Sequence, residues 1–423
     1  MGKKEFEVLS KAPKGTNDIL PSQIDYWYYT EKIIKEVLQN YGYREIRTPA
    51  FEHTELFVRG IGDTTDIVNK EMFTFQDRKG RSLTLRPEGT APVVRAYLEH
   101  HLERGNPLTK LFYLGSMFRC EKPQAGRYRQ FNQFGLEAIG SQLPLVDFEI
   151  ISASLSIYQK LGLKNLNLLI NSVGCQKCRP RYLNVLRDYF RDKREYLCVD
   201  CRERFEKNPL RILDCKNKQC QLEIKNSPSI FDYLCEDCIE HFKKLTEYLD
   251  SLQIKYEVNP LLVRGLDYYT KTAFEIISGE LGSQNAVGGG GRYDYLVEAL
   301  GGKHTPAVGF AAGIERIITT MKKQKIEIPL WNGIKVFVAT TTPKDITDAL
   351  KITEMIREEG INTEMDFLEK SLKAQMRLAN KLNVSFVIIV GEEELKEQKV
   401  VIKNMSNGEQ EKISISQILN FLK

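Results

Sequence analysis

Long apolar segments are absent from this sequence of 423 residues. The longest clear run, Phe386 to Val390, is far too short to cross a bilayer. The first ten residues contain no apolar core of the kind that an export signal needs, and Phe6 stands where a myristoylation motif requires Ser or Thr. The sequence therefore argues against membrane and secreted proteins, and we expect a cytoplasmic one.

Histidine is also scarce, since the chain has only five, and none stands beside a serine or cysteine that it could activate as a nucleophile. The glycine run Gly288 to Gly291 fits neither the G-x-G-x-x-G pattern of dinucleotide-binding folds nor a P-loop ending in G-K-[ST]. We expect these glycines to let a strand pass flat beneath a ligand ring. Any catalysis should rest on positioning and charge neutralisation, with a group of the substrate making the attack.

What is present is an ordinary globular composition, with 42% hydrophobic and 28% charged residues. The length suffices for two or three domains, each with a core of its own. The net charge of +5 permits a polyanionic partner without requiring one. Composition alone therefore favours a folded, soluble protein and leaves its chemistry open.

Changes of pattern predict an α+β fold in four segments. Residues 1–171 and 256–328 are expected to form two parts of one antiparallel sheet flanked by helices, and residues 172–255, rich in Arg, Lys and Cys, a mainly helical insertion. Strands alternating with helices in residues 333–423 favour a small α/β domain with a largely parallel sheet. Short strands are expected over residues 41–51, ending near Pro49, and over residues 261–263.

Residues 112–140 predict two strands joined by a basic loop. Alternation places polar and glycine residues on one face of each strand: Tyr113, Gly115, Met117, Arg119 and Glu121 on the first, and Arg129, Phe131, Gln133, Gly135 and Glu137 on the second. Glycine inside a strand is costly unless something approaches the backbone closely. The pattern indicates a floor for a ligand with negative charge and a flat ring, although an ordinary amphipathic hairpin would also show alternation.

Three arginines, Arg119, Arg264 and Arg316, lie in apolar or glycine-rich surroundings. A buried arginine needs a carboxylate partner or an anionic ligand. One such residue would favour an internal ion pair, but three near glycine-rich backbone favour phosphate. Glu88, at the end of a predicted strand and followed by Gly89, can point at a bound cation, or it can simply complement the dipole of the next helix.

Eight of the nine cysteines fall between residues 175 and 238. They form the pairs Cys175 and Cys178, Cys198 and Cys201, Cys215 and Cys220, and Cys235 and Cys238. In a cytosolic chain this spacing predicts structural zinc, with four thiolates for each ion, before it predicts disulfides. Free buried thiols are the alternative, and the order of the pairs does not say which would share a metal.

Several of these segments resemble the histidyl-tRNA synthetases, which are class II aminoacyl-tRNA synthetases. Residues 47–52 (RTPAFE), 118–137 and 309–316 look like the three motifs of the class, the first of which builds a dimer interface. Residues 262–269 (LVRGLDYY) and 286–293 (AVGGGGRY) resemble the two signatures of the histidine enzymes. The likeness runs over essentially the whole chain.

The resemblance implies ATP-dependent activation of L-histidine to histidyl-adenylate, with Mg²⁺, and transfer of histidine to tRNA(His) by a homodimer. It implies that Arg119 and Arg264 are catalytic. The implied ATP-binding residues are Arg119 at the α-phosphate, Glu121 and Phe131 at adenine, Arg127, and Arg316 at the γ-phosphate. The implied histidine-binding residues are Glu88, Gly89, Thr90, Gln133, Glu137, Arg264, Tyr268 and Tyr269, with Glu137 and Tyr269 at the imidazole.

The same resemblance makes residues 333–423 an anticodon-binding domain and places the insertion near the acceptor arm of tRNA. Zinc is not part of it, because the family does not require cysteine at these positions. One alternative is the synthetase-like regulatory subunit of histidine biosynthesis, which typically lacks catalytic-motif residues and the anticodon-binding domain. A second, a zinc protein that only binds nucleic acid, would leave the three arginines unexplained.

Overall fold

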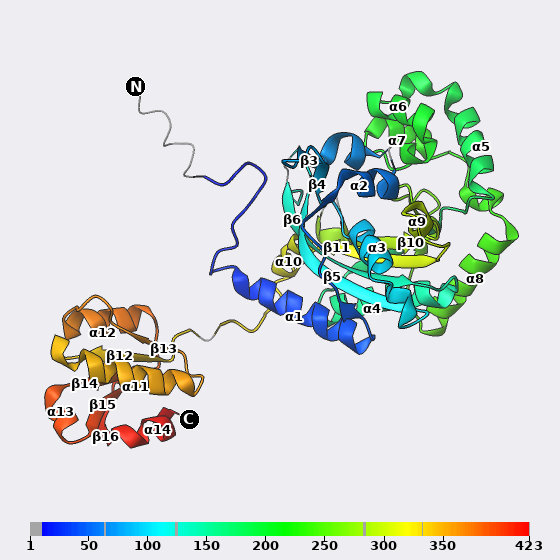
Figure 1. The fold of residues 1–423 in the computed structure, drawn as a ribbon. Helices are drawn as coiled ribbons and strands as arrows, with labels where there is room; N and C mark the ends of the chain where they lie inside the picture. The colour runs from blue at the N-terminus through cyan, green and yellow to red at the C-terminus, as the bar shows by residue number, and fades with distance from the viewer. Residues whose placement is uncertain (1–10, 63–64, 123–125, 282–284, 332, 423) are drawn as a thin grey trace, which may run out of the picture. The chain divides into compact units, whose positions relative to one another are not determined.

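The computed structural model describes residues 11–62, 65–122, 126–281, 285–331 and 333–422. The ten N-terminal residues, which carry the expectation about export and lipidation, lie outside them. The chain divides into two compact units, Met1–Ile328 and Pro329–Lys423 (Figure 1). None of the described helices is long and apolar enough to span a membrane.

A sheet of eight strands forms the centre of the first unit, in the order β1-β5-β6-β11-β10-β9-β7-β8. Every pairing from β5 to β7 is antiparallel, as the sequence predicts, and only the short edge strands β1 and β8 pair in parallel. In sheet order the strands span Arg44–Glu45, Thr109–Phe118, Gln130–Ile139, Ala307–Gly313, Ala286–Arg292, Thr270–Ser278, Leu166–Ser172 and Glu257–Val258.

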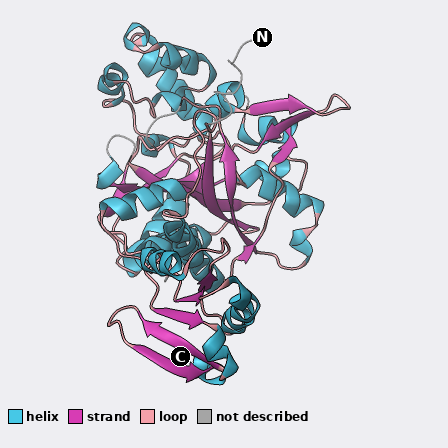
Figure 2. Ribbon diagram, turned by 90° about the vertical axis from the view of Figure 1, so that its left-hand side faces the viewer, coloured by secondary structure: helices cyan, strands magenta, loops and turns pink. Residues whose placement is uncertain are grey.

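Helices cover both faces of this sheet (Figure 2). One face packs against α1 (Ile24–Asn40), α4 (Pro144–Lys160) and α10 (Ile314–Lys323), whose apolar residues recur every three or four positions. The other face packs against α3 (Thr90–Glu99) and α9 (Leu296–Ala299). Because both faces carry a core, the ligand-facing side of the hairpin β5–β6 is itself partly apolar.

Two of the short predicted strands are wrong. Residues 41–51 give only the two residues of β1 in the large sheet, and beyond Pro49, which has no N–H to donate, the chain continues as β2 (Phe51–His53). With β3 (Phe73–Gln76) and β4 (Ser82–Leu85), β2 forms a separate three-stranded sheet beside α2 (Thr54–Ile61). Residues 261–263 are not a strand, because a turn at Asn259 bonds its carbonyl to Leu262.

The insertion is mainly helical, as predicted. Its helices are α5 (Arg179–Arg191), α6 (Val199–Lys207), α7 (Lys218–Ile224) and α8 (Glu236–Ser251). A small core that includes Tyr182, Leu186 and Phe190 holds α5 to α7 together. The second half of α8 instead buries Leu245 and Leu249 in the core beneath the large sheet. The insertion is therefore joined to the sheet through a shared core as well as through the chain.

The second unit is an α/β domain with a five-stranded sheet in the order β13-β12-β14-β15-β16. Its strands, in that order, are Thr363–Met365, Val336–Thr340, Phe386–Val390, Lys399–Asn404 and Gln410–Ser414, and its helices are Ile346–Glu358, Leu372–Lys381, Glu392–Lys396 and Ile418–Leu422 (α11 to α14). The expected largely parallel sheet holds only for β13, β12 and β14. The last two strands add antiparallel, and the Asn407-Gly408 turn, with Gly408 at φ +80°, joins β15 to β16 as a hairpin.

Candidate active site

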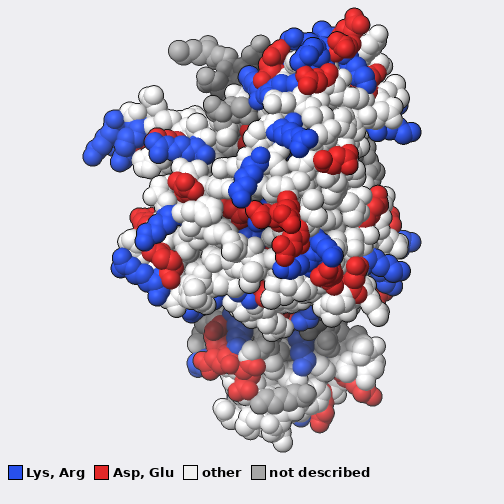
Figure 3. Space-filling model, turned by 90° about the vertical axis from the view of Figure 1, so that its right-hand side faces the viewer, with Lys and Arg blue, Asp and Glu red and all other residues white. Residues whose placement is uncertain are grey.

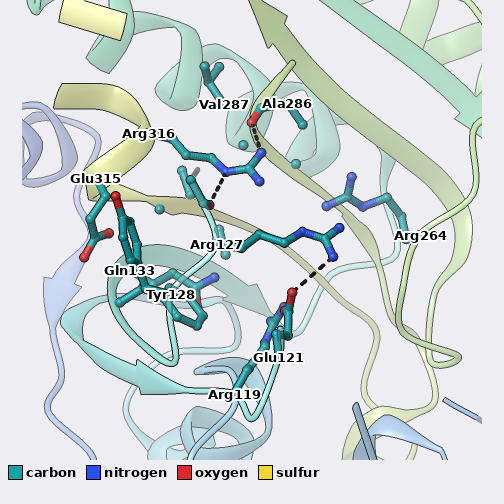
Figure 4. Close-up of a pocket in the computed structure, with 17 residues that line it drawn as sticks. Arg119, Glu121, Arg127, Tyr128, Gln133, Arg264, Ala286, Val287, Glu315 and Arg316 are labelled. Carbon is teal, nitrogen blue, oxygen red and sulfur yellow. Dashed lines mark hydrogen bonds and ion pairs between the residues drawn. The ribbon is translucent and has the colours of Figure 1, made fainter. Parts of the chain in front are cut away.

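A cavity of about 250 Å³ opens over the antiparallel strands of the first unit (Figure 4). Strand register brings the two predicted polar faces together, since Gly115 pairs with Gln133 and Met117 with Phe131. The cavity is lined by Arg119, Glu121, Arg127, Phe131, Gln133, Arg264 and Arg316, and also by Tyr128, Glu315 and backbone of β10 and β11. Residues separated by almost two hundred positions thus share one space.

Arg119 and Arg127 lie on the hairpin side of the cavity with one carboxylate between them. Arg119 contacts Glu121 at 3.7 Å and lies 5.3 Å from the ring centre of Phe131, and Arg127 contacts Glu121 at 3.1 Å. Arg119 also donates to the carbonyl of Pro87 at 2.9 Å. Two guanidinium groups therefore share Glu121, which leaves a surplus of positive charge at this wall.

Arg264 and Arg316 face the same space from the opposite wall (Figure 4). Arg264 donates to Glu275 at 2.6 Å, so the alternative of an internal ion pair holds in part for this residue. Arg316, in the first turn of α10, donates to the carbonyls of Ala286 at 2.8 Å and Gly126 at 3.3 Å. Burial and the neighbouring Arg127 lower the pKa of Arg316, as expected where cations crowd together.

A second group of predicted residues lies deeper, around the carboxylate of Glu137. Only 1% of Glu137 is exposed, and its oxygens accept hydrogen bonds from Thr90 Oγ1 at 2.8 Å and from the hydroxyl of Tyr293 at 2.5 Å. Burial raises the pKa of Glu137 to about 8. The rings of Tyr268 and Tyr269 lie 4.8 Å apart, and the Tyr268 ring lies 5.6 Å from that of Tyr293. The group offers hydrogen-bonding atoms inside an aromatic wall.

Glu88 belongs to the same group and lies just before the start of α3. Its two carboxylate oxygens accept from the backbone N–H of Thr90 at 2.7 Å and of Ala91 at 2.8 Å. The helix-capping role that the sequence left open is therefore present. Glu88 is 3% exposed, and burial raises its pKa. In the same wall, the buried Oε1 of Gln133 has no hydrogen-bond partner among the described residues, as expected of an atom that awaits a ligand.

Glycine makes room for these side chains at three strand positions. A Cβ at Gly289 would lie 2.5 Å from the Arg264 guanidinium, one at Gly309 would lie 1.8 Å from Glu137, and one at Gly135 would overlap the ring of Tyr113. The prediction that the glycine run lies flat beneath a ligand ring needs correction at Gly289. The Arg264 guanidinium occupies the space that a Cβ at this position would fill. These glycines admit the functional side chains rather than only a ligand.

Sequence reasoning assigned no role to Tyr293, Glu275 or Tyr113. Tyr113 carried a signal, since alternation placed it on the ligand face of the hairpin. Tyr293 stands at the end of the second signature, but only the fold brings its hydroxyl to Glu137. Glu275 carried no signal, because its contact with Arg264 depends on how β9 pairs with β10.

The eight clustered cysteines come together in two groups of four. Cys175 and Cys178 join Cys235 and Cys238, and Cys198 and Cys201 join Cys215 and Cys220. Within each group the sulfur atoms all lie within 4.8 Å of one another, and none forms a disulfide. Either group could hold a metal ion.

Two family models match the chain. The model described as histidyl-tRNA synthetase matches residues 15–178 and 215–317, and that described as anticodon binding domain matches residues 335–423. The chain belongs to the histidyl-tRNA synthetase family. The matched residues include every predicted ATP-binding and histidine-binding position. They leave out residues 179–214, which carry two of the eight clustered cysteines, Cys198 and Cys201.

Relatives of this family match nearly the full length. The chain is 51% identical over 416 residues to the histidine–tRNA ligase of Pelotomaculum thermopropionicum, covering 98% of both chains. It is 52% identical over 409 residues to that of Halothermothrix orenii, covering 97% of this chain and 98% of the relative. The structure of apo S. aureus histidyl-tRNA synthetase is 39% identical, with a TM-score of 0.81 over 97% of this chain and 99% of that one. The antiparallel sheet is thus the sheet of class II synthetases.

Proposed function

We propose that this chain is a histidine–tRNA ligase that activates L-histidine with ATP and transfers it to tRNA(His). The observation that carries the proposal is the cavity in which Arg119, Arg264 and Arg316 meet, together with the buried carboxylate of Glu137. Guanidinium groups suit the phosphates of ATP, and a buried carboxylate suits the imidazole N–H of histidine. Relatives that are about half identical bear the name histidine–tRNA ligase.

ATP is assigned to the arginine-lined side. Arg119 would hold the α-phosphate, Arg316 the γ-phosphate, and Phe131 would stack on adenine while Glu121 accepts from its amino group. Arg127 would add charge at the phosphates. The hard carboxylate oxygens of Glu315, which lines the cavity, suit a Mg²⁺ ion that binds together with the phosphates and neutralises their charge.

Histidine is assigned to the buried side. Glu137 and Tyr269 would recognise the imidazole, with Tyr268 in the same aromatic wall. Gln133, whose Oε1 has no partner among the described residues, would accept from the substrate ammonium. Glu88, Gly89 and Thr90, at the start of α3, would complete the ammonium site.

The reaction needs no protein nucleophile. A carboxylate oxygen of histidine attacks the α-phosphorus, the bond from this phosphorus to the β-phosphate oxygen breaks, and pyrophosphate leaves. A hydroxyl of the terminal ribose of tRNA then attacks the carbonyl carbon and releases its proton to solvent, the bond from this carbon to the phosphate oxygen breaks, and AMP leaves. Arg264 and Arg119 would stabilise the negative charge that spreads over the α-phosphate in the first step. Arg264 would also bridge that phosphate and the histidine carboxylate.

The proposal extends to the architecture. Residues 1–171 with 256–328 form the catalytic domain, residues 172–255 the insertion toward the acceptor arm, and residues 333–423 the anticodon-binding domain. The segment 47–52 would build the interface of a cytoplasmic homodimer. Basic and acidic side chains are mixed over the face seen in Figure 3, so charge alone does not mark a tRNA site on that face. Zinc would serve the insertion and not the reaction, because the described lining of the cavity includes no cysteine.

Amino-acid-dependent exchange of pyrophosphate into ATP tests the proposal. The purified protein should catalyse exchange with histidine and not with the other amino acids, and should charge tRNA(His). A regulatory subunit or a protein that only binds nucleic acid would catalyse no exchange. Exchange with a different amino acid would contradict the assignment of Glu137 to the imidazole.

A further inference from the structure

Each of the two cysteine groups joins chain segments that are distant in sequence. The first group, Cys175, Cys178, Cys235 and Cys238, joins the end of β7 to the start of α8. The second group, Cys198, Cys201, Cys215 and Cys220, joins the start of α6 to α7. These two sets are called the inner and the outer cysteine group.

The sulfur positions match a tetrahedral metal site. In the inner group Cys175 Sγ lies 3.8 Å from Cys178 Sγ and 3.7 Å from Cys235 Sγ, and in the outer group Cys198 Sγ lies 3.8 Å from Cys215 Sγ. Four sulfurs at ~2.3 Å from a central zinc would lie about 3.8 Å apart. Backbone N–H groups also donate to sulfur in both groups, which favours the thiolate form that binds a metal. Two such groups in one small region are hard to attribute to free thiols that pack as apolar residues.

Residues next to the inner group form hydrogen bonds with the end of the loop Arg264–Tyr269 and with the residues that follow it. Arg179, which follows Cys178 directly, donates to the carbonyls of Val173 at 3.0 Å and Gly174 at 3.2 Å, and also to the carbonyl of Tyr269. The backbone N–H of Lys271 donates to Gly174 at 2.8 Å. The turn that carries Cys175 and Cys178 therefore fixes the backbone of Tyr269.

Residues between the cysteines of the outer group form hydrogen bonds with the start and the middle of the same loop. The segment between Cys201 and Cys215 carries Arg211, whose Nη1 donates to the carbonyl of Arg264 at 3.0 Å. It also carries Asn208, whose Nδ2 donates to Asp267 Oδ1 at 2.9 Å. Arg211 is only 8% exposed, so this contact is shielded from water.

We propose that each cysteine group binds one Zn²⁺ ion through four thiolates, and that the two sites together hold the loop Arg264–Tyr269 in position. Binding would release the thiol protons of each group to solvent and needs no oxidant or reductant. The role of the loop rests on the proposed function, because Arg264 and Tyr269 matter only if histidine is activated there. The metal sites do not depend on it.

Metal analysis tests the sites without any assay of activity. Protein prepared without added metal should contain two zinc ions per chain. The double variant Cys235→Ser with Cys238→Ser should contain one, and so should Cys198→Ser with Cys201→Ser. Cys120→Ser, which changes the one exposed cysteine outside the groups, is the control and should retain two. Fewer than two ions in the unaltered chain, or iron in their place, would overturn the proposal.

Cobalt provides a second readout for variants that fold poorly. Protein purified from cells grown with Co²⁺ should show the visible absorption of tetrahedral cobalt bound to thiolates. Each double variant that folds should show half of this absorption per chain. Absorption typical of octahedral cobalt would contradict the four-thiolate assignment.

Arg179→Ala tests the positioning role while leaving every cysteine in place. This variant should retain two zinc ions and raise the histidine KM about tenfold, since it removes a hydrogen bond to the backbone of Tyr269, with a smaller effect on the ATP KM. Arg179→Lys should raise the histidine KM less than Arg179→Ala does. Arg187→Ala, on the same helix, is the control and should leave the histidine KM unchanged. An unchanged histidine KM with full zinc would overturn the positioning role. If the unaltered chain shows no histidine-dependent exchange, the proposed function is rejected. The metal sites are then still tested by the number of zinc ions per chain.

Discussion

Two kinds of arginine lie inside the first unit, and they differ in what surrounds their charge. Arg292 is wholly buried and contacts Asp147 at 2.5 Å and Asp294 at 3.0 Å, with further hydrogen bonds to backbone carbonyls. Arg119 and Arg264 have side chains 23% and 20% exposed, and both line a cavity of about 250 Å³. The first kind is fully enclosed by its partners, and the second faces open space.

The difference shows how the same residue type serves the fold in one place and a ligand in another. A buried guanidinium is tolerated only when charge and hydrogen bonds satisfy it completely, so Arg292 has nothing left to offer a substrate. An arginine at a cavity keeps part of its charge solvated and can exchange water for phosphate. Enclosed charges should therefore govern stability, and cavity charges should govern activity.

Arg264→Ala should produce the largest effect on activity. We expect histidine-dependent pyrophosphate exchange to fall by about 10³-fold, because the charge that stabilises the reacting α-phosphate is lost. Histidine binding, measured by calorimetry, should change less. Arg78→Ala, at an exposed turn, is the matched control. Near-normal exchange in Arg264→Ala would remove this residue from the reaction.

Glu137→Ala should have the next largest effect, and its effect should be on histidine. We expect kcat/KM for histidine to fall about 100-fold, since a buried hydrogen-bonding partner of the imidazole is lost, while the ATP KM changes little. Tyr293→Phe removes one hydrogen bond to the same carboxylate and should cost about tenfold. A larger change in the ATP KM than in the histidine KM would place Glu137 on the wrong side of the site.

Asp147→Asn tests the enclosed arginine. Although burial opposes it, contact with Arg292 and His241 holds the pKa of Asp147 well below its usual range. Removing this charge leaves Arg292 underpaired, and we expect the free energy of unfolding to fall by about 3–5 kcal/mol. The exposed pair of Asp188 and Arg191 provides the control, because Asp188→Asn should cost less than about 1 kcal/mol. Equal losses in urea denaturation would contradict the distinction between the two kinds of arginine.

The sequence predicted the features that depend on short-range pattern. Strand alternation was enough to place Arg119, Gln133 and Glu137 on one face, and the spacing of the cysteine pairs was enough to single out the eight cysteines that meet in two groups of four. It left open the outcomes that depend on contacts between distant segments. The pairing of Cys175 with Cys235 rather than with Cys198 is set by how α8 returns to the sheet, which no local signal records.

The same limit applies to the arginines. Arg292 follows a glycine run and Arg264 precedes a glycine, so their local sequences look equally suited to a ligand. Only the fold brings Asp147, on α4, against Arg292 and leaves a cavity beside Arg264. Register likewise supplies Glu275 as the partner of Arg264. Local pattern can thus name candidate arginines, and topology decides which of them are enclosed.

The pH dependence of stability shows whether Glu137 behaves as an enclosed or as an open charge. Its pKa is raised from 4.5 to about 8 by burial, so the folded state holds a proton that the unfolded state releases. The stability that this proton contributes is fully present below pH 4.5 and is lost as pH rises toward about 8. Glu137→Gln cannot ionise and should lack this decline.

Urea denaturation across this pH range measures the difference between the two proteins. The free energy of unfolding of Glu137→Gln, minus that of the unaltered chain, should grow as pH rises. Glu247→Gln, on the exposed side of α8, should run parallel to the unaltered chain at every pH. A parallel course for Glu137→Gln would mean that Thr90 and Tyr293 enclose a stable carboxylate, as Asp147 is enclosed by Arg292. A growing difference would mean that the protein itself does not stabilise the ionised Glu137 carboxylate. The missing partner would then be a bound imidazole.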